Sequence, residues 1–187
     1  MLFAYDTETN LAAAVVLANS AEDPDTLTSV AELDAFYAEF RYTGRHDRTT
    51  SELDQVRALR PRLRALLTAD RDVAAALVNE VLAEHSALPR LVRHDGLDWH
   101  IHAVADDAPL AARISVETAM ALLDIIRLDE LSRLALCADP DCSGIVLDLS
   151  RNRSRRFCSV ACTNRAAAAA YRERARNARS TSTKVSG

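Results

Sequence analysis

The sequence predicts a mainly α-helical protein, with a larger helical N-terminal domain and a short C-terminal module that contains all the cysteines. Hydrophobic residues make up 49% of the 187 residues, whereas aromatic residues make up 5% and there are only four glycines. This composition favours a compact helical fold over a sheet-rich or disordered one. Apolar residues also recur at helical spacing through most of the chain before the first cysteine.

Charge divides the chain at the same place as the cysteines. Residues 1–136 contain 13 arginines against 23 acidic residues, a net charge of −10, and residues 137–187 contain 10 basic against 4 acidic residues, a net charge of +6. We therefore predict a helical domain over residues 1–134, a basic module over residues 135–180 and a disordered polar tail over residues 181–187.

Five stretches of the N-terminal domain carry apolar residues at helical spacing. They run from Leu11 to Ala18, from Val30 to Phe40, from Val56 to Leu67, from Val73 to Leu82 and from about Pro109 to Arg127. Pro61 interrupts the third stretch, so we expect a kink or a new helix start there. A short helical turn is predicted for residues 129–134.

Between the fourth and fifth helices the apolar period changes to two, which predicts a small β-hairpin. Leu97, Trp99 and Ile101 alternate with Asp98, His100 and His102 after the turn residues Asp95 and Gly96. His100 and His102 share one strand face, so a metal pair would fit their spacing. We favour a solvated face, because the sequence places no third ligand close to them.

Nothing in the N-terminal domain argues for catalysis, and we predict that the protein is not an enzyme. His46, His85 and His94 stand apart in polar surroundings, without a nucleophile motif beside them. The four glycines are scattered and form no phosphate-binding loop. The rival hypothesis is an enzyme whose site the sequence does not reveal; a polar pocket with perturbed side chains would favour it.

The N-terminal residues do not resemble a targeting signal. The apolar run from Leu11 to Ala18 is short and follows Asp6 and Glu8, where a signal peptide would be basic. We also expect no membrane span, because no apolar stretch is long enough. A cytoplasmic location is therefore predicted, in which thiols stay reduced and clustered cysteines bind metal more often than they form disulfides.

The four cysteines fall in two close pairs that are typical of a structural zinc site. Cys137, Cys142, Cys158 and Cys162 give the pattern C-x4-C-x15-C-x3-C. Between the pairs, "IVLDLS" alternates like a strand, "RNRS" turns the chain, "RRFC" returns it, and Ser159 can cap a helix that carries the last cysteine. This order predicts a treble-clef-like finger that holds one structural Zn²⁺ per chain, with every coordination position filled by protein.

Arginines crowd this finger. Arg151, Arg153, Arg155 and Arg156 lie at its turn and returning strand, and Arg165, Arg172, Arg176 and Arg179 fall within an arc of about 60° on the last helix. Such a surface suits a polyanion, and nucleic acid, in particular double-stranded DNA, is the predicted partner. Docking on an acidic protein partner is the alternative, since charge density alone does not separate the two.

The segment "CADPDCSGIVLDLSRNRSRRFCSVACTNRAAAAAYRERAR" resembles the CGNR-type zinc finger of bacterial proteins regarded as stress-induced transcription regulators. The likeness rests on the cysteine pairs, on "DLSRNRSRRFC" between them, and on Cys162, Asn164 and Arg165. Thr163 replaces the motif glycine, and Phe157 stands where tryptophan is common. "LANS" at residues 17–20 and "DTLTSVAELDAF" after it are similar to the ABATE domain that precedes this finger.

The resemblance implies a sensor-like helical domain coupled to a DNA-binding finger, whose contacts would also include Asn152 and Asn164. We expect the N-terminal domain to bind a small ligand or a protein partner, or to form a homodimer. The short apolar link "LDELSRLAL" predicts that the finger docks against this domain. Asp124, Asp129 or Glu130 would then mask finger arginines.

Overall fold

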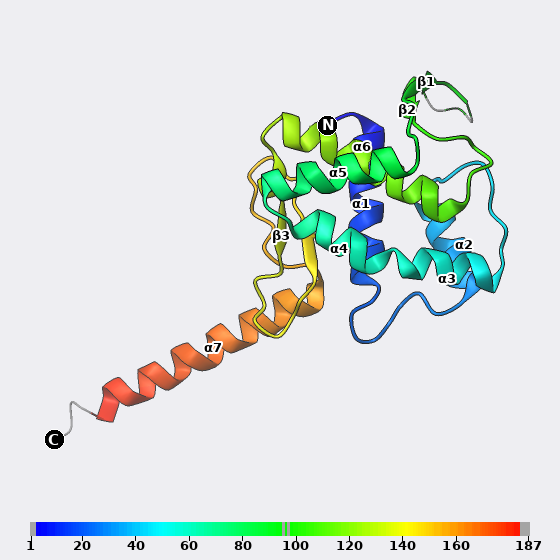
Figure 1. Cartoon of the computed structure of the whole chain (residues 1–187). Coiled ribbons are helices and arrows are strands. Elements are labelled where there is room, and N and C mark those ends of the chain that lie inside the picture. Colours follow the sequence, from blue (N-terminus) through cyan, green and yellow to red (C-terminus); the bar gives the residue numbers. More distant parts are fainter. Residues whose placement is uncertain (1–2, 95, 97, 184–187) are drawn as a thin grey trace.

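The computed structural model describes residues 3–94, 96 and 98–183, and its α-helices form one body with a long helix projecting from it (Figure 1). The helices are α1 (Tyr5–Asn19), α2 (Val30–Glu39), α3 (Thr50–Ala58), α4 (Arg60–Thr68), α5 (Arg71–Glu84), α6 (Leu110–Arg127) and α7 (Val160–Thr183). Helix α1 packs against α6 and α4, and α5 covers the other side of α6.

Local signals in the sequence account for several helix boundaries. Ser29 forms a capping box with Glu32 at the start of α2, and Asp70 caps α5 through the backbone N–H of Val73. Pro61 lies in the first turn of α4, where its missing N–H costs nothing, so the predicted restart is confirmed. Helix α1 begins at Tyr5, before the predicted Leu11. The prediction missed its first turns because they are polar and show little apolar periodicity.

Leucine and isoleucine side chains from α1, α4 and α6 fill the main core. The largest fully buried side chains there include Leu11, Leu17, Leu63, Leu66, Leu110, Ile114, Leu122 and Ile125. The removal of this apolar area from water is the dominant favourable contribution to folding.

The predicted hairpin forms from β1 (Arg90–Val92) and β2 (His100–His102), which are antiparallel with Val92 opposite His100. The turn residue Gly96 has a φ of 75°, while Asp95 and Leu97 lie outside the described residues. The prediction that His100 and His102 lie on a solvated face of the hairpin is wrong. Trp99 and Leu91 are exposed, whereas the histidines are half-buried, because hydrogen-bond acceptors and the N-terminus of α1 lie on the histidine side.

A second hairpin joins the finger to the helical body. Strand β4 (Ile145–Leu147) is the predicted "IVLDLS" strand, but it pairs with β3 (Leu134–Leu136), before the first cysteine, and not with "RRFC". The returning segment is held differently: the Asp148 carboxylate accepts the backbone N–H of Ser150 at 2.8 Å and of Arg155 at 2.7 Å. A side chain thus replaces the strand ladder that we expected there.

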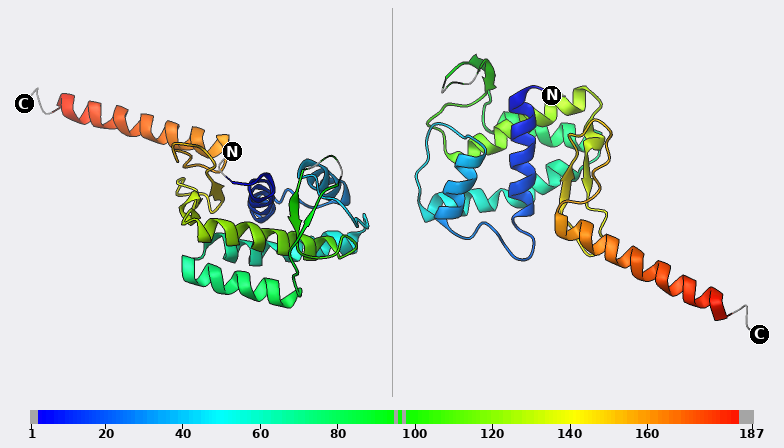
Figure 2. Two further views of the ribbon diagram at one scale, coloured as in Figure 1. Left: turned by 90° about the horizontal axis from the view of Figure 1, so that it is seen from above. Right: turned by 180° about the vertical axis from the view of Figure 1, so that it is seen from behind.

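Helix α7 leaves the finger and projects away from the body, on the side opposite the β1–β2 hairpin (Figures 1 and 2). It reaches Thr183, and so includes the first three residues of the predicted tail, while residues 184–187 lie outside the described part. The limits of the three predicted segments remain a prediction. Within the described residues, none of the helices combines the length and apolar character needed to span a lipid bilayer.

Candidate metal centre and nucleic-acid interface

The structure brings the four predicted cysteines together. Their Sγ atoms all lie within 4.8 Å of one another, and Cys158 Sγ is 3.5 Å from Cys142 Sγ and 3.6 Å from Cys162 Sγ. All four are free thiols. A tetrahedral zinc with Zn–S bonds of about 2.3 Å separates its sulfurs by about 3.8 Å, so the cluster fits one zinc ion with small adjustments.

Backbone and side-chain donors surround these sulfurs. The N–H of Gly144 donates to Cys142 Sγ at 3.4 Å, and the N–H of Cys158 donates to Cys137 Sγ at 3.5 Å. Arg165 Nη2 donates to Cys162 Sγ at 3.0 Å. Such donors stabilise thiolates and orient metal ligands.

The electrostatics of the cluster require a cation when the cysteines ionise together. Burial raises the pKa of the Cys158 thiol well above its usual range, and the three neighbouring thiols raise it further. Burial likewise raises the pKa of Cys142. Four thiolates this close are therefore stable only with a positive ion among them, which is the role of Zn²⁺ in a four-cysteine site.

Arg165, a predicted nucleic-acid contact, already has partners inside the finger. Its Nε lies 2.7 Å from Oδ2 of the buried Asp139, in addition to the contact with Cys162. Asn164 beside it is exposed on α7. Thr163 at the motif glycine is also exposed, and its hydroxyl donates to the Ser159 carbonyl at 3.1 Å, so the helix accommodates this departure.

Three arginines of the turn segment also make contacts within the protein. Arg153 Nη2 lies 2.6 Å from Glu130 Oε2, and Arg155 donates to the carbonyls of Phe157 and Cys158 at 3.4 and 3.3 Å. The guanidinium carbon of Arg156 lies 5.9 Å from the Phe157 ring centroid, within the range of a cation–π contact. All three side chains still reach the surface.

Four of the remaining predicted contacts are exposed. Arg151 and Asn152 lie at the tip of the turn, and Arg172 and Arg176 lie on the projecting part of α7. Among the described residues, Arg151, Arg172 and Arg176 have no carboxylate partner. The backbone of Arg179 is helical, and its side chain lies outside the described part.

The finger is docked on the helical body, as the short link predicted. The Asn19 side chain donates to the carbonyl of Ile145 at 2.8 Å and accepts its N–H at 2.7 Å. Buried Arg133 pairs with Glu130 at 2.8 Å and donates to the Asp148 carbonyl at 2.9 Å. Glu22 accepts a hydrogen bond from the hydroxyl of Ser143.

The expected masking of finger arginines is seen for one of the three acidic residues. Glu130 contacts Arg153. Asp129 instead pairs with Arg71 of α5 at 3.2 Å, and the Asp124 carboxylate accepts a hydrogen bond from the Thr7 hydroxyl at 2.7 Å.

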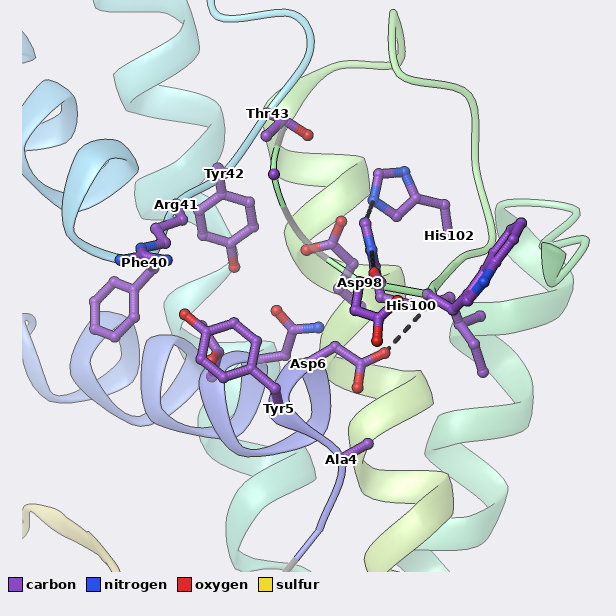
Figure 3. Close-up of a pocket in the computed structure, with 16 residues that line it drawn as sticks. Ala4, Tyr5, Asp6, Phe40, Arg41, Tyr42, Thr43, Asp98, His100 and His102 are labelled. Carbon is purple, nitrogen blue, oxygen red and sulfur yellow. Dashed lines mark hydrogen bonds between the residues drawn. The ribbon is translucent and has the colours of Figure 1, made fainter. Parts of the chain in front are cut away.

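The N-terminal domain contains a pocket that sequence reasoning missed (Figure 3). It has a volume of about 380 Å³ and lies between α1, the segment after α2, the β1–β2 hairpin and α6. Aromatic residues on its walls are Tyr5, Phe40, Tyr42 and Trp99. No local motif marks it, because its residues come from four separate parts of the chain.

Glu117 gives this pocket an unusual titrating group. Burial raises the pKa of its carboxyl to about 7 despite the nearby Arg113, with Asp6 and Asp106 contributing further. His100 and His102 line the same pocket (Figure 3). The structure also brings His94 to these two histidines, a third member that the turn of the hairpin supplies.

Comparison with known families identifies both parts of the chain. The CGNR zinc finger model matches residues 133–175, and the ABATE model, described as "Putative stress-induced transcription regulator", matches residues 11–136. A search of curated proteins finds no match. The finger match and the cysteine geometry together assign one structural Zn²⁺ to the four cysteines. The chain therefore belongs to the ABATE family and carries a CGNR zinc finger after its helical domain.

Proposed function

We propose that the protein is a cytoplasmic, zinc-dependent transcription regulator whose finger binds double-stranded DNA. The observation that carries this proposal is a set of exposed arginines, Arg151, Arg172 and Arg176, that have no carboxylate partner within the described part of the chain. They lie on a finger whose shape the cysteine site maintains. Phosphate groups would supply the missing counter-charge, and the release of condensed cations would favour binding.

Each part of the finger has a separate task in this proposal. The four cysteines hold Zn²⁺, which fixes the fold of a module too small to have its own core. Helix α7 is 24 residues long, about 36 Å, and presents Arg172 and Arg176 one turn apart on the same face. An α-helix fits the major groove, and the arginines at the turn would contact the adjacent phosphates.

The test is a double substitution on α7. Arg172→Ala with Arg176→Ala should weaken binding to a random duplex and reduce the slope of log K against log salt by about 1 to 2, because two phosphate contacts are lost. Arg93→Ala is the matched control, since Arg93 is exposed after β1, in the hairpin on the side of the body opposite α7 (Figures 1 and 2). If the control and the double variant weaken binding equally, this face of α7 is not the DNA interface.

We also propose that the pocket of the N-terminal domain binds a small ligand. Its volume of about 380 Å³ and its aromatic walls suit a small organic molecule with a polar group near Glu117 or Arg41. Trp99 is the single tryptophan of the chain and lines this pocket, so its emission is a direct probe. A ligand in the pocket should change Trp99 emission, and Tyr42→Ala should weaken its binding.

The same pocket supports a second candidate, an enzymatic N-terminal domain. Glu117, with its pKa raised to about 7, could exchange a proton near neutral pH. Mass spectrometry of a bound ligand after prolonged incubation separates the two candidates. A sensor returns the ligand unchanged, whereas an enzyme converts it, and Glu117→Gln then abolishes the conversion.

A further inference from the structure

Three histidine rings meet at the base of the β1–β2 hairpin. The ring centroids of His94, His100 and His102 are separated by 4.8, 5.0 and 4.9 Å, so they form a nearly equilateral triangle. Each ring offers one nitrogen within 4.8 Å of the others. His100 and His102 lie two residues apart on one face of β2. His94 lies two residues after Val92, which is opposite His100, so it extends β1 on the same face.

The outer nitrogens of two rings have hydrogen-bond partners that can only accept. His100 Nδ1 lies 2.8 Å from the carbonyl oxygen of Asp98, and His102 Nδ1 lies 3.0 Å from the Asp106 carboxylate. Both Nδ1 atoms therefore carry a proton, and in neutral rings both Nε2 atoms carry a lone pair. This arrangement, in which a backbone carbonyl or carboxylate accepts the outer N–H, is the usual support of a metal-binding histidine.

The two Nε2 atoms of His100 and His102 face each other at 3.2 Å (Figure 3). Two lone pairs at this distance repel unless a cation lies between them. With Zn–N bonds of about 2.0–2.1 Å, a tetrahedral zinc separates two ligand nitrogens by about 3.3–3.4 Å, close to the distance found here.

Asp106, which accepts the N–H of His102, and strand β2 are both held in place by the rest of the domain. The Asp106 carbonyl accepts the N–H of Arg45 at 2.8 Å, and Gly44 lies so close to it that an added Cβ would be 2.3 Å from this oxygen. On the other side, the Asp6 carboxylate accepts the N–H of Ile101 at 3.2 Å, which fixes β2 to α1. The histidine positions thus do not depend on the hairpin alone.

We propose that His94, His100 and His102 bind one divalent transition-metal ion, Zn²⁺ or an ion of the same class, as a second metal site separate from the four cysteines. Three imidazoles select such ions over Mg²⁺ or Ca²⁺, which prefer oxygen ligands. Three protein ligands leave one tetrahedral position open. Because His100 and His102 also line the pocket, that position is available to water or to a donor atom of a pocket ligand.

The competing explanation is a hydrogen-bonded histidine cluster that takes an extra proton in place of a metal ion. The two explanations differ in measured metal content. Wild-type protein that holds zinc only in its finger should bind one further equivalent of Zn²⁺ in calorimetry. When Co²⁺ is added to this protein in place of the further Zn²⁺, it should give ligand-field bands without sulfur-to-cobalt charge transfer, since the proposed site contains nitrogen ligands only.

His100→Ala with His102→Ala should abolish this second binding event and leave the finger zinc in place. His85→Ala is the matched control and should bind as wild type does, because His85 lies at the end of α5, outside the cluster. Asp106→Ala keeps all three ligands but removes the carboxylate partner of His102, and it should weaken Zn²⁺ binding about 10- to 100-fold.

Two results would overturn the proposal. The first is that wild-type protein binds no metal beyond the finger zinc, which needs no variant to fold and would identify a hydrogen-bonded cluster. The second is that the double histidine variant binds the second ion as tightly as wild type, which would place that ion elsewhere. DNA binding is measured separately, so failure here leaves the proposed function of the finger untouched.

Discussion

Asn19 joins the two parts of the molecule with a single side-chain amide. At the end of α1 it both donates to and accepts from the backbone of Ile145, the first residue of β4. Both backbone groups are otherwise without a strand partner on that side, so the amide completes the hydrogen bonding of a buried strand. This contact gives a physical role to the "LANS" segment that resembles the ABATE domain.

Asn19→Ala should lower the free energy of unfolding by about 2 kcal/mol, because it leaves a buried N–H and a buried carbonyl without partners. Asn19→Asp keeps the acceptor and should lose part of this amount. Urea unfolding followed by circular dichroism measures both, with Asn79→Ala on the exposed face of α5 as control. An Asn19→Ala protein as stable as the control would show that the amide contact does not hold the finger.

Glu117 should make folding stability depend on pH. Its pKa is raised from 4.5 to about 7, with burial as the main cause, Arg113 opposing it, and Asp6 and Asp106 adding to it. Between pH 4.5 and about 7 the folded protein holds a proton on Glu117 that the unfolded chain releases. The free energy of unfolding therefore falls as the pH rises through this range, and the loss is complete above about pH 7.

Glu117→Gln stays neutral and escapes this penalty. Its stability relative to wild type should therefore increase between pH 5 and pH 8, by up to about 3 kcal/mol. Denaturant unfolding at both pH values measures this change, with Glu80→Gln on the exposed face of α5 as control. A difference between wild type and variant that is the same at both pH values would contradict a raised pKa.

Gly144 is needed for space beside the cysteine sulfurs. A Cβ at this position would lie 2.8 Å from Cys158 Sγ and 3.3 Å from Cys142 Sγ. Gly144→Ala should therefore displace two ligands and speed the loss of zinc to a chelator, whereas Asn152→Ala, at the exposed turn, should not. Equal zinc release from the two variants would show that the sulfurs adjust without cost.

At the scale of elements, β4 explains how a small metal module becomes part of a larger fold. Its outer residues Ile145 and Leu147 belong to the main core, and Val146 between them packs with Cys137 and Cys162. Because side chains alternate across a strand, three residues serve two cores. A change in the geometry of the zinc site should therefore also shift side chains in the core of the helical body.

Comparison of the elements with the sequence shows which features could be predicted and which could not. Helix existence, the restart at Pro61 and the cysteine cluster follow from local periodicity and spacing, and the structure confirms them. The partner of β4 and the inward face of β2 do not, since they depend on groups distant in the sequence, such as Asn19 beside β4 and Asp6 beside β2. The pocket was missed for the same reason.

At the scale of the whole molecule, α1 is the connection between the pocket and the finger. Its first turns contribute Asp6, Thr9 and Asn10 to the pocket, and its last residue, Asn19, holds β4. The helix has 15 residues and spans about 22 Å. Figures 1 and 2 show the hairpin and α7 on opposite sides of the body, so a signal from the pocket would reach the finger through this rigid element.

The central claim is that zinc shapes a finger whose arginines bind DNA. The most direct measurement is fluorescence anisotropy with a labelled random duplex at several salt concentrations, for the zinc-loaded full chain and for Cys158→Ser. The zinc-loaded protein should bind with an affinity that falls log-linearly with salt, and Cys158→Ser should lose both its zinc and most of this binding. Equal binding by the two proteins, or no binding of duplex by the zinc-loaded chain, would contradict the claim.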